Sequence, residues 1–244
     1  MASSGKIRAD GILFDKDGTL IDFDAFWVSL SSAALEVILS SLQQDTALVQ
    51  PLLALFGVRD GVTDINSVLC KGTYGQLAQI LQAFLQERGC AVSLAALEKL
   101  VLDSYNGCAH LGEVKPTCPE LSAVLQSLKA KGKKLGLVTT DNPKLSALCL
   151  EKLGVLELFD HLYTDDGCLP VKPDPGCALA FCDAEGLTAH RVVMVGDTLT
   201  DMEFARNAGL KAIGLASRAE NRASLAPHAD RMIGTLSELL EILE

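Results

Sequence analysis

Short apolar runs that end abruptly in polar residues constrain the fold of this chain more than any other feature. One such run ends at Asp15, a second ends at Thr139 and a third ends at Asp197. Runs of this length and composition are typical of buried β-strands. Segments with helical apolar spacing lie between the runs, and strands that alternate with helices predict a mostly parallel sheet covered on both faces. The sequence therefore predicts an α/β fold with a doubly wound, Rossmann-like core.

The predicted elements follow one another in regular order along the chain. We expect strands at 11–15, 134–139, 159–164, 191–196, 210–215 and 231–234, and helices at 119–131, 143–153, 176–185, 200–208 and 236–243. In open parallel sheets, ligands bind beyond the carboxyl ends of the strands. Because Asp15, Thr139 and Asp197 all fall at such ends, we expect them to converge on one pocket.

The pattern changes between Asp22 and Lys115, where helical spacing continues and no convincing strand is found. Helices are expected near 26–39, 46–56, 76–88 and 94–106. We therefore predict a core made of residues 1–21 and 116–244, with an all-helical cap domain at 22–115. The alternative is a packing subdomain without a role in chemistry. The cap is favoured because its two ends would hinge beside the strand ends.

The charge and composition exclude several classes of protein. The formal net charge is -10, and no basic stripe is visible, so nucleic-acid binding is not expected. No signal peptide is recognised at the N-terminus, and no uncharged apolar run approaches the roughly 20 residues of a membrane helix. The 8 cysteines form no Cys-x-x-Cys pair, so they are expected to pack as small apolar residues. We expect a cytoplasmic protein, either a monomer or a homodimer, without a membrane partner.

The segment from Asp15 to Leu20 carries the clearest chemical signal. Side chains two residues apart in an extended segment point the same way. Asp15 and Asp17 should therefore face one space, with Lys16 turned aside. Two carboxylates held together are costly unless a cation or the chemistry of a bound anion uses them. The sequence thus predicts a functional site at the end of the first strand.

Four segments together resemble the four motifs of the haloacid dehalogenase superfamily, whose commonest members are magnesium-dependent phosphatases. They are the segment that begins at Asp15, the pair Thr139-Thr140, Lys172 before Pro173, and the Gly-Asp-x-x-x-Asp run that ends at Asp201. Their order is the order of the family. The helical insertion resembles the cap that follows the first motif in many of these enzymes. The pattern is most similar to phosphoglycolate-phosphatase-like members.

The resemblance implies a role for each acidic residue. Asp15 is expected to be the nucleophile, since an ionised carboxylate can form an aspartyl phosphate without a base. Asp15 and Asp197 are expected to bind Mg²⁺ through their side chains, with the backbone carbonyl of Asp17 as a third protein ligand. Asp201 is expected either to bind the metal through water or to hold Lys172. A helix-capping role for Asp201 is the competing interpretation.

The other motif residues are expected to handle protons and phosphate charge. Asp17 is the expected general acid and then the base that activates water. Dehalogenases of the superfamily lack this aspartate, so Asp17 favours phosphoryl transfer. Thr139 and the backbone N–H of Thr140 are expected to donate to phosphate oxygens, and Lys172 to neutralise them. Lys16 departs from the apolar residue common at its position, and we expect a structural or surface role for it.

Substrate choice is expected to lie in the insertion. The segment from Cys70 to Gly75 places basic and polar side chains between helical segments, and loops of this kind often carry specificity. Lys71, Thr73 and Tyr74 are the candidate substrate contacts.

The sequence therefore predicts a Mg²⁺-dependent phosphatase that hydrolyses a small phosphorylated metabolite through an aspartyl-phosphate intermediate. One alternative is a phosphomutase of the same fold. A second, from a different class, is a phosphoacceptor signalling or binding domain without turnover; Asp17 and the helical insertion disfavour it.

Overall fold

The computed structural model describes residues 5–216 and 219–244. The chain divides into two compact units. The first unit, hereafter the core unit, consists of Met1–Asp22 and Lys115–Glu244, and the second consists of Phe23–Val114. The second unit is therefore an insertion between two parts of the first. Each unit is described below by itself.

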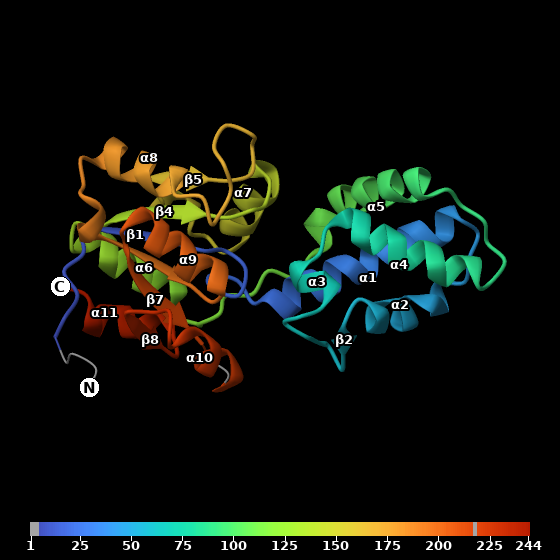
Figure 1. Ribbon diagram of the computed structural model, residues 1–244, viewed down its shortest axis with the longest axis horizontal. Helices are drawn as coiled ribbons and strands as arrows, with labels where there is room; N and C mark the ends of the chain where they lie inside the picture. Colours follow the sequence, from blue (N-terminus) through green and yellow to red (C-terminus); the bar gives the residue numbers. More distant parts are fainter. Residues whose placement is uncertain (1–4, 217–218) are drawn as a thin grey trace. The chain divides into compact units, whose positions relative to one another are not determined.

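In the described residues, the core unit contains one six-stranded sheet in which all neighbouring strands are parallel. The strands lie in the order β5 (His161–Tyr163), β4 (Lys134–Val138), β1 (Gly11–Phe14), β6 (Val192–Gly196), β7 (Lys211–Leu215) and β8 (Arg231–Ile233). Strand β1, blue in Figure 1, thus lies between strands that come from much later in the chain. The predicted mostly parallel α/β fold is confirmed.

Alternate residues of the strands face two separate hydrophobic clusters. On β1, Ile12 and Phe14 join one cluster and Leu13 joins the other. The first face packs against α6 (Leu121–Ala130), α7 (Pro143–Lys152) and α11 (Leu239–Ile242), and the second packs against α8 (Gly176–Glu185), α9 (Leu199–Ala208) and α10 (Ala219–Leu225). Because both faces are buried, the strands are continuous apolar runs rather than alternating ones.

Two glycines on adjacent strands let helix α8 pack closely against the sheet. The aromatic ring of Phe181 lies over β1 and β4, where a Cβ atom at Gly11 would come within 2.7 Å of it and one at Gly136 within 3.1 Å. The ring also meets His161 edge-on, with centroids 5.7 Å apart. Phe181 is fully buried. This contact holds α8 against the second face of the sheet, next to β1 and β4. Asp15 and Thr139 follow these two strands.

The strand ends place three polar residues at one edge of the sheet. Asp15 follows β1 directly, Thr139 follows β4 and Asp197 follows β6. The backbone N–H of Asp15 donates to the Val195 carbonyl at 2.9 Å, and the N–H of Thr139 donates to the Tyr163 carbonyl at 3.0 Å. The parallel ladders therefore hold both residues one position beyond the strands.

The second unit is mainly helical. It contains α1 (Phe23–Ser41), α2 (Val49–Leu55), α3 (Val68–Lys71), α4 (Tyr74–Gln86) and α5 (Leu94–Cys108). It also contains a hairpin, β2 (Val58–Arg59) and β3 (Val62–Thr63), so the expectation of an all-helical insertion needs this correction. The turn uses Asp60 and Gly61, both with positive φ, at 51° and 76°. Asp-Gly is a strong hairpin signal, but the two-residue strands are too short to give a strand pattern.

Helix α1 is long and apolar enough to cross a membrane by length and composition alone, with a mean hydropathy of 1.3. Its buried residues include Phe26, Leu30 and Leu35. The core helix of a globular unit passes the same test, so this single helix is weak evidence for a membrane span.

We predict that Phe181→Ala destabilises the core unit by about 3–5 kcal/mol, because it leaves a cavity over the two strand glycines. Urea unfolding followed by circular dichroism measures the effect. Leu179→Ala is the matched control, since Leu179 lies in the same helix and is 52% exposed. A cost at Phe181 no larger than that at Leu179 would contradict the packing described.

Candidate active site

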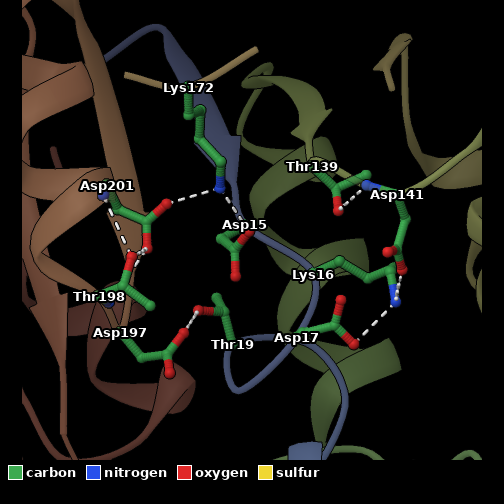
Figure 2. A network of polar contacts seen from close by, with 10 residues as sticks. All are labelled: Asp15, Lys16, Asp17, Thr19, Thr139, Asp141, Lys172, Asp197, Thr198 and Asp201. Atoms are coloured by element: carbon green, nitrogen blue, oxygen red, sulfur yellow. Dashed lines mark hydrogen bonds and ion pairs between the residues drawn. The ribbon is translucent and has the colours of Figure 1, made fainter. Parts of the chain in front are cut away.

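Polar side chains gather at the carboxyl edge of the sheet, around the ends of β1, β4 and β6 (Figure 2). The residues are Asp15, Lys16, Asp17, Thr19, Thr139, Asp141, Lys172, Asp197, Thr198 and Asp201. All of them belong to the core unit. The structure thus brings together the candidate residues of all four predicted motifs.

Lys172 joins the end of β1 to the start of α9. Its Nζ atom donates to Asp15 Oδ1 at 2.5 Å and to Asp201 Oδ1 at 2.6 Å. The Lys172 side chain is 5% exposed and that of Asp201 is fully buried, so water screens these pairs little. Burial alone would lower the pKa of Lys172, but Asp15 and Asp201 hold that pKa above its usual range. The ammonium group is therefore charged and fixed beside Asp15.

Asp201 has two structural roles at once. Its Oδ2 accepts from the Thr198 hydroxyl at 2.6 Å and from the Thr198 backbone N–H at 3.1 Å, and its own N–H donates back to Thr198 Oγ1. This is a capping box at the start of α9. Its other oxygen, Oδ1, holds Lys172. The capping interpretation and the lysine-holding interpretation are thus both correct for Asp201.

Asp197 is held against the turn that follows β1. Its Oδ1 accepts from the hydroxyl of Thr19, a fully buried residue, at 2.9 Å. Gly18 has a φ of +77°, and a Cβ atom there would lie 2.2 Å from Asp197 Oδ2. Only a glycine fits both the backbone conformation and the space. The close approach keeps Asp197 near Asp15.

The acidic residues fit a divalent cation. Asp15, Asp197 and Asp201 each offer a carboxylate oxygen, and these oxygens all lie within 4.8 Å of one another. Burial raises the pKa of Asp15 to about 7, against the opposing charge of Lys172 and with added repulsion from Asp201 and Asp17. Burial also raises the pKa of Asp197 well above its usual range, and Asp15 and Asp201 raise it further. One ammonium does not balance three carboxylates, and a hard cation would.

Thr139 and the helix that follows it form a corner of the kind to which anions bind, hereafter the anion-binding corner. The Oγ1 atom of Thr139 accepts from the Asp141 N–H at 3.2 Å, which leaves its hydroxyl proton available to donate. Asn142 caps α7 by accepting from the Leu145 N–H at 2.9 Å, and Pro143 occupies the first turn. Helix α7 therefore begins four residues after Thr139, and helix N-termini favour anions.

The burial of Lys16 distinguishes between the two roles, structural or surface, that the sequence suggests for it. It is fully buried, so the surface role suggested for it is wrong. Its Nζ lies 2.8 Å from Asp17 Oδ1 and 2.8 Å from Asp141 Oδ2. In Figure 2 the Asp17 carboxylate turns toward Lys16 and away from Asp15. The alternation expected for Asp15 and Asp17 fails because β1 ends at Phe14 and the chain then turns.

Asp141 is a member of the cluster that the sequence did not assign to the site. Burial and repulsion from Asp17 together raise the pKa of its carboxyl group to about 6, against the attraction of Lys16. The sequence signal that could have placed Asp141 in the site is its position two residues after Thr139. A buried lysine in the first motif requires carboxylate partners nearby, and Asp141 supplies one of them.

The three candidate substrate contacts of the insertion lie in the second unit and have local roles there. Lys71 Nζ donates to Asn66 Oδ1 at 2.6 Å. Thr73 is the N-cap of α4, in a capping box with Gln76. The ring of Tyr74 packs on that of Tyr105, with centroids 5.1 Å apart. The segment is a junction between two helices rather than an open loop, and its contact with substrate stays a prediction.

A parallel sheet whose edge collects acidic, hydroxyl and lysine side chains is the architecture of an α/β phosphoryl-transfer enzyme. A family profile for haloacid dehalogenase-like hydrolases matches residues 9–209. The chain belongs to this family, as the order of its four motifs predicted.

Curated relatives of similar length include phosphatases. The N-acetylmuramic acid 6-phosphate phosphatase of Pseudomonas aeruginosa is 28% identical over 247 residues, which covers 98% of this chain and 96% of the relative. A phosphoglycolate phosphatase of Vibrio parahaemolyticus is 28% identical over 237 residues, which covers 95% of each. The family and these relatives identify the protein as a phosphatase, a phosphoric monoester hydrolase.

Solved structures share the fold over nearly the whole chain. A predicted phosphoglycolate phosphatase from Haemophilus somnus aligns with a TM-score of 0.67 at 20% identity, and covers 96% of this chain and 97% of that one. A superfamily hydrolase from Geobacter sulfurreducens aligns with a TM-score of 0.69 at 16% identity, and covers 99% of this chain and 100% of that one. At these identities the likeness supports the fold alone.

We predict that Gly18→Ala lowers phosphatase activity at least tenfold, because a methyl group at this position displaces the Asp197 carboxylate. Gly132→Ala is the matched control: Gly132 has the same φ of +77°, but nothing lies within 4 Å of its Cβ position. Both variants carry the same backbone strain, of about 1–2 kcal/mol. Equal activities for the two variants would show that contact with Asp197 is unimportant.

Proposed function

We propose that this phosphatase is Mg²⁺-dependent and hydrolyses small phosphorylated metabolites through an aspartyl phosphate on Asp15. The observation that carries the proposal is the position of Asp15 at the centre of the sheet edge, between Lys172 on one side and Asp197 on the other (Figure 2). A carboxylate there has a cation partner, a metal-ligand neighbour and access to the anion-binding corner at Thr139.

In the first step a carboxylate oxygen of Asp15 attacks phosphorus, and the bond from phosphorus to the leaving oxygen breaks. Asp15 Oδ1 is held by Lys172, so the lysine orients the carboxylate and stands beside the incoming phosphoryl oxygens. The Thr139 hydroxyl and the Thr140 backbone N–H donate to the remaining oxygens. Each of these donors stabilises charge as it develops in the transition state.

Asp15 and Asp197 are the side chains that would hold the cation, with the Asp17 backbone carbonyl beside them. When bound, Mg²⁺ supplies positive charge that favours the ionised form of both carboxylates and permits a phosphate dianion to approach. Both oxygens of Asp201 already accept hydrogen bonds, from Lys172 and from Thr198. Asp201 is therefore assigned to positioning Lys172.

Asp17 is the proposed general acid and base. It gives a proton to the leaving alkoxide, and then takes a proton from the water that attacks the aspartyl phosphate, so that Asp15 and inorganic phosphate are released. The same carboxyl group returns to its starting state after one turnover. Its location on the turn after β1, two residues from the nucleophile, supports this role.

The relatives suggest the class of substrate. Their names specify a carboxylate-bearing sugar phosphate and the small acid phosphate phosphoglycolate. We propose a small phosphate monoester that also carries a carboxylate, with Lys71, Thr73 and Tyr74 as candidate contacts from the inserted unit, which would act as a cap. A cytoplasmic location, a monomeric or homodimeric state, and the lack of nucleic-acid or membrane partners are parts of the same proposal.

We predict that Asp15→Asn reduces the release of inorganic phosphate at least a thousandfold, because an amide oxygen is a far weaker nucleophile than a carboxylate. The assay is phosphate release from a panel of small phosphate monoesters, and unfolding curves check the fold. Asp10→Asn is the control, since Asp10 pairs with Arg191 at 2.7 Å on the same unit but is not part of the cluster. Turnover by the Asp15→Asn variant at the wild-type rate would eliminate the mechanism.

We predict that excess chelator abolishes turnover and that added Mg²⁺ restores it, while Ca²⁺, which prefers looser and larger coordination, restores it poorly. Phosphate release before and after metal addition is the measurement. Full activity in chelator would count against Asp15 and Asp197 as metal ligands.

The same panel separates hydrolysis from phosphate migration. A phosphomutase would convert one sugar phosphate isomer into another without net release of inorganic phosphate. A solved structure from Thermotoga maritima that is described as a β-phosphoglucomutase shares the fold, with a TM-score of 0.68 at 22% identity. We expect phosphate release in every productive reaction of this protein.

A further inference from the structure

A second lysine lies in the site, and the mechanism above gives it no part. Lys16 is fully buried, and its ammonium group lies between Asp17 and Asp141, 2.8 Å from an oxygen of each. We propose that Lys16 is a positioning residue that holds the Asp17 carboxylate apart from the metal-binding carboxylates and ties it to the turn after Thr139. This inference rests on the proposed function, in which Asp17 is the acid and base.

The cost of burying Lys16 points to a specific use. Taking an ammonium group out of water costs several kcal/mol, and ion pairs recover this only with good geometry. Burial and ion pairing act in opposite directions on Lys16. Burial alone would lower its pKa, but Asp17 and Asp141 hold that pKa above its usual range. An apolar residue would fill the same space without this cost. A charged lysine is retained where its two partners need it.

The partners of Lys16 divide the acidic residues into two sets. Lys172 contacts Asp15 and Asp201, whereas Lys16 contacts Asp17 and Asp141. In Figure 2, Asp17 and Asp141 lie on the opposite side of Asp15 from Asp201. Without Lys16, the Asp17 carboxylate would be drawn toward a cation bound by Asp15 and Asp197, where it would act as a ligand. The second lysine keeps it available for proton transfer.

The backbone of Lys16 strengthens this arrangement. Its carbonyl oxygen accepts from the N–H groups of Leu20 and Ile21, at 2.9 Å and 3.0 Å, and so closes the turn that contains Asp17. Asp141 belongs to the segment between Thr139 and the cap of α7. Lys16 therefore links the turn that bears the acid to the turn that binds phosphate. Relative placement of this kind controls the rate of proton transfer.

The test uses the leaving group of the substrate. An alkyl phosphate needs a proton on its leaving oxygen, whereas p-nitrophenyl phosphate has a leaving group stable enough to depart without one. The ratio kcat/KM reports the steps up to departure of the leaving group. For Lys16→Met we expect kcat/KM to fall about 30-fold or more for an alkyl phosphate, approaching the roughly 100-fold or more that a general acid contributes. For p-nitrophenyl phosphate we expect a fall of less than about threefold.

A double variant separates positioning from charge balance. Lys16→Met leaves Asp141 without its cation, so Lys16→Met/Asp141→Asn removes that charge and is expected to regain stability but keep the leaving-group defect. Lys129→Met is the matched control, because Lys129 also pairs with an aspartate in the core unit, at 2.7 Å, and lies outside the cluster. It should leave both kcat/KM values unchanged.

Each outcome decides the proposal. A defect confined to the alkyl phosphate in the single and double variants supports it. An equal loss on both substrates, full recovery in the double variant, or failure of both variants to fold would overturn it, since Lys16 would then serve only the fold. Activity in the Asp15→Asn variant would instead reject the proposed function, so the two failures are distinguishable.

Discussion

Negative charge is concentrated at one edge of the buried sheet of the core unit, and the contacts of the candidate active site compensate for it. Asp15 stands at the end of the central strand, where parallel neighbours on both sides bring Thr139 and Asp197 beside it. Like charges at this distance repel strongly in a poorly solvated space. Lys172 offsets part of the repulsion through Asp15 and Asp201, and Thr19 offsets part through Asp197. The negative charge that remains is of the kind that a divalent cation would neutralise.

Much of this could be predicted from the sequence, because the relevant signals are local. The apolar runs before Asp15, Thr139 and Asp197 are strands, and the predicted helices lie near the positions that the 3.6-residue spacing indicates, although the short helices α3 and α10 were not predicted. Since strand ends in a parallel sheet share one edge, the convergence of these residues follows from topology alone. Asn142 and Pro143 likewise predict the start of α7. Each of these predictions needs only neighbours in the chain.

The features that the sequence did not predict depend on contacts between distant segments or on very short elements. Alternation was extended to Asp17, but the strand ends at Phe14, so the direction of that carboxylate is set by Lys16 and Asp141 instead. No local pattern indicates that the lysine directly after Asp15 is fully buried. The hairpin at Asp60 and Gly61 was missed because its strands are two residues long.

The sheet order has a consequence for how the protein is made. Strand β1 is synthesised before its pairing partners β4 and β6, which lie more than 100 residues further along the chain. Contacts of such high sequence separation fold slowly, and unpaired strand edges invite association with other chains in the meantime. The inserted unit is synthesised during that interval and has its own helical contacts to form. The edges of β1 therefore stay unpaired until the segments that contain β4 and β6 have been synthesised.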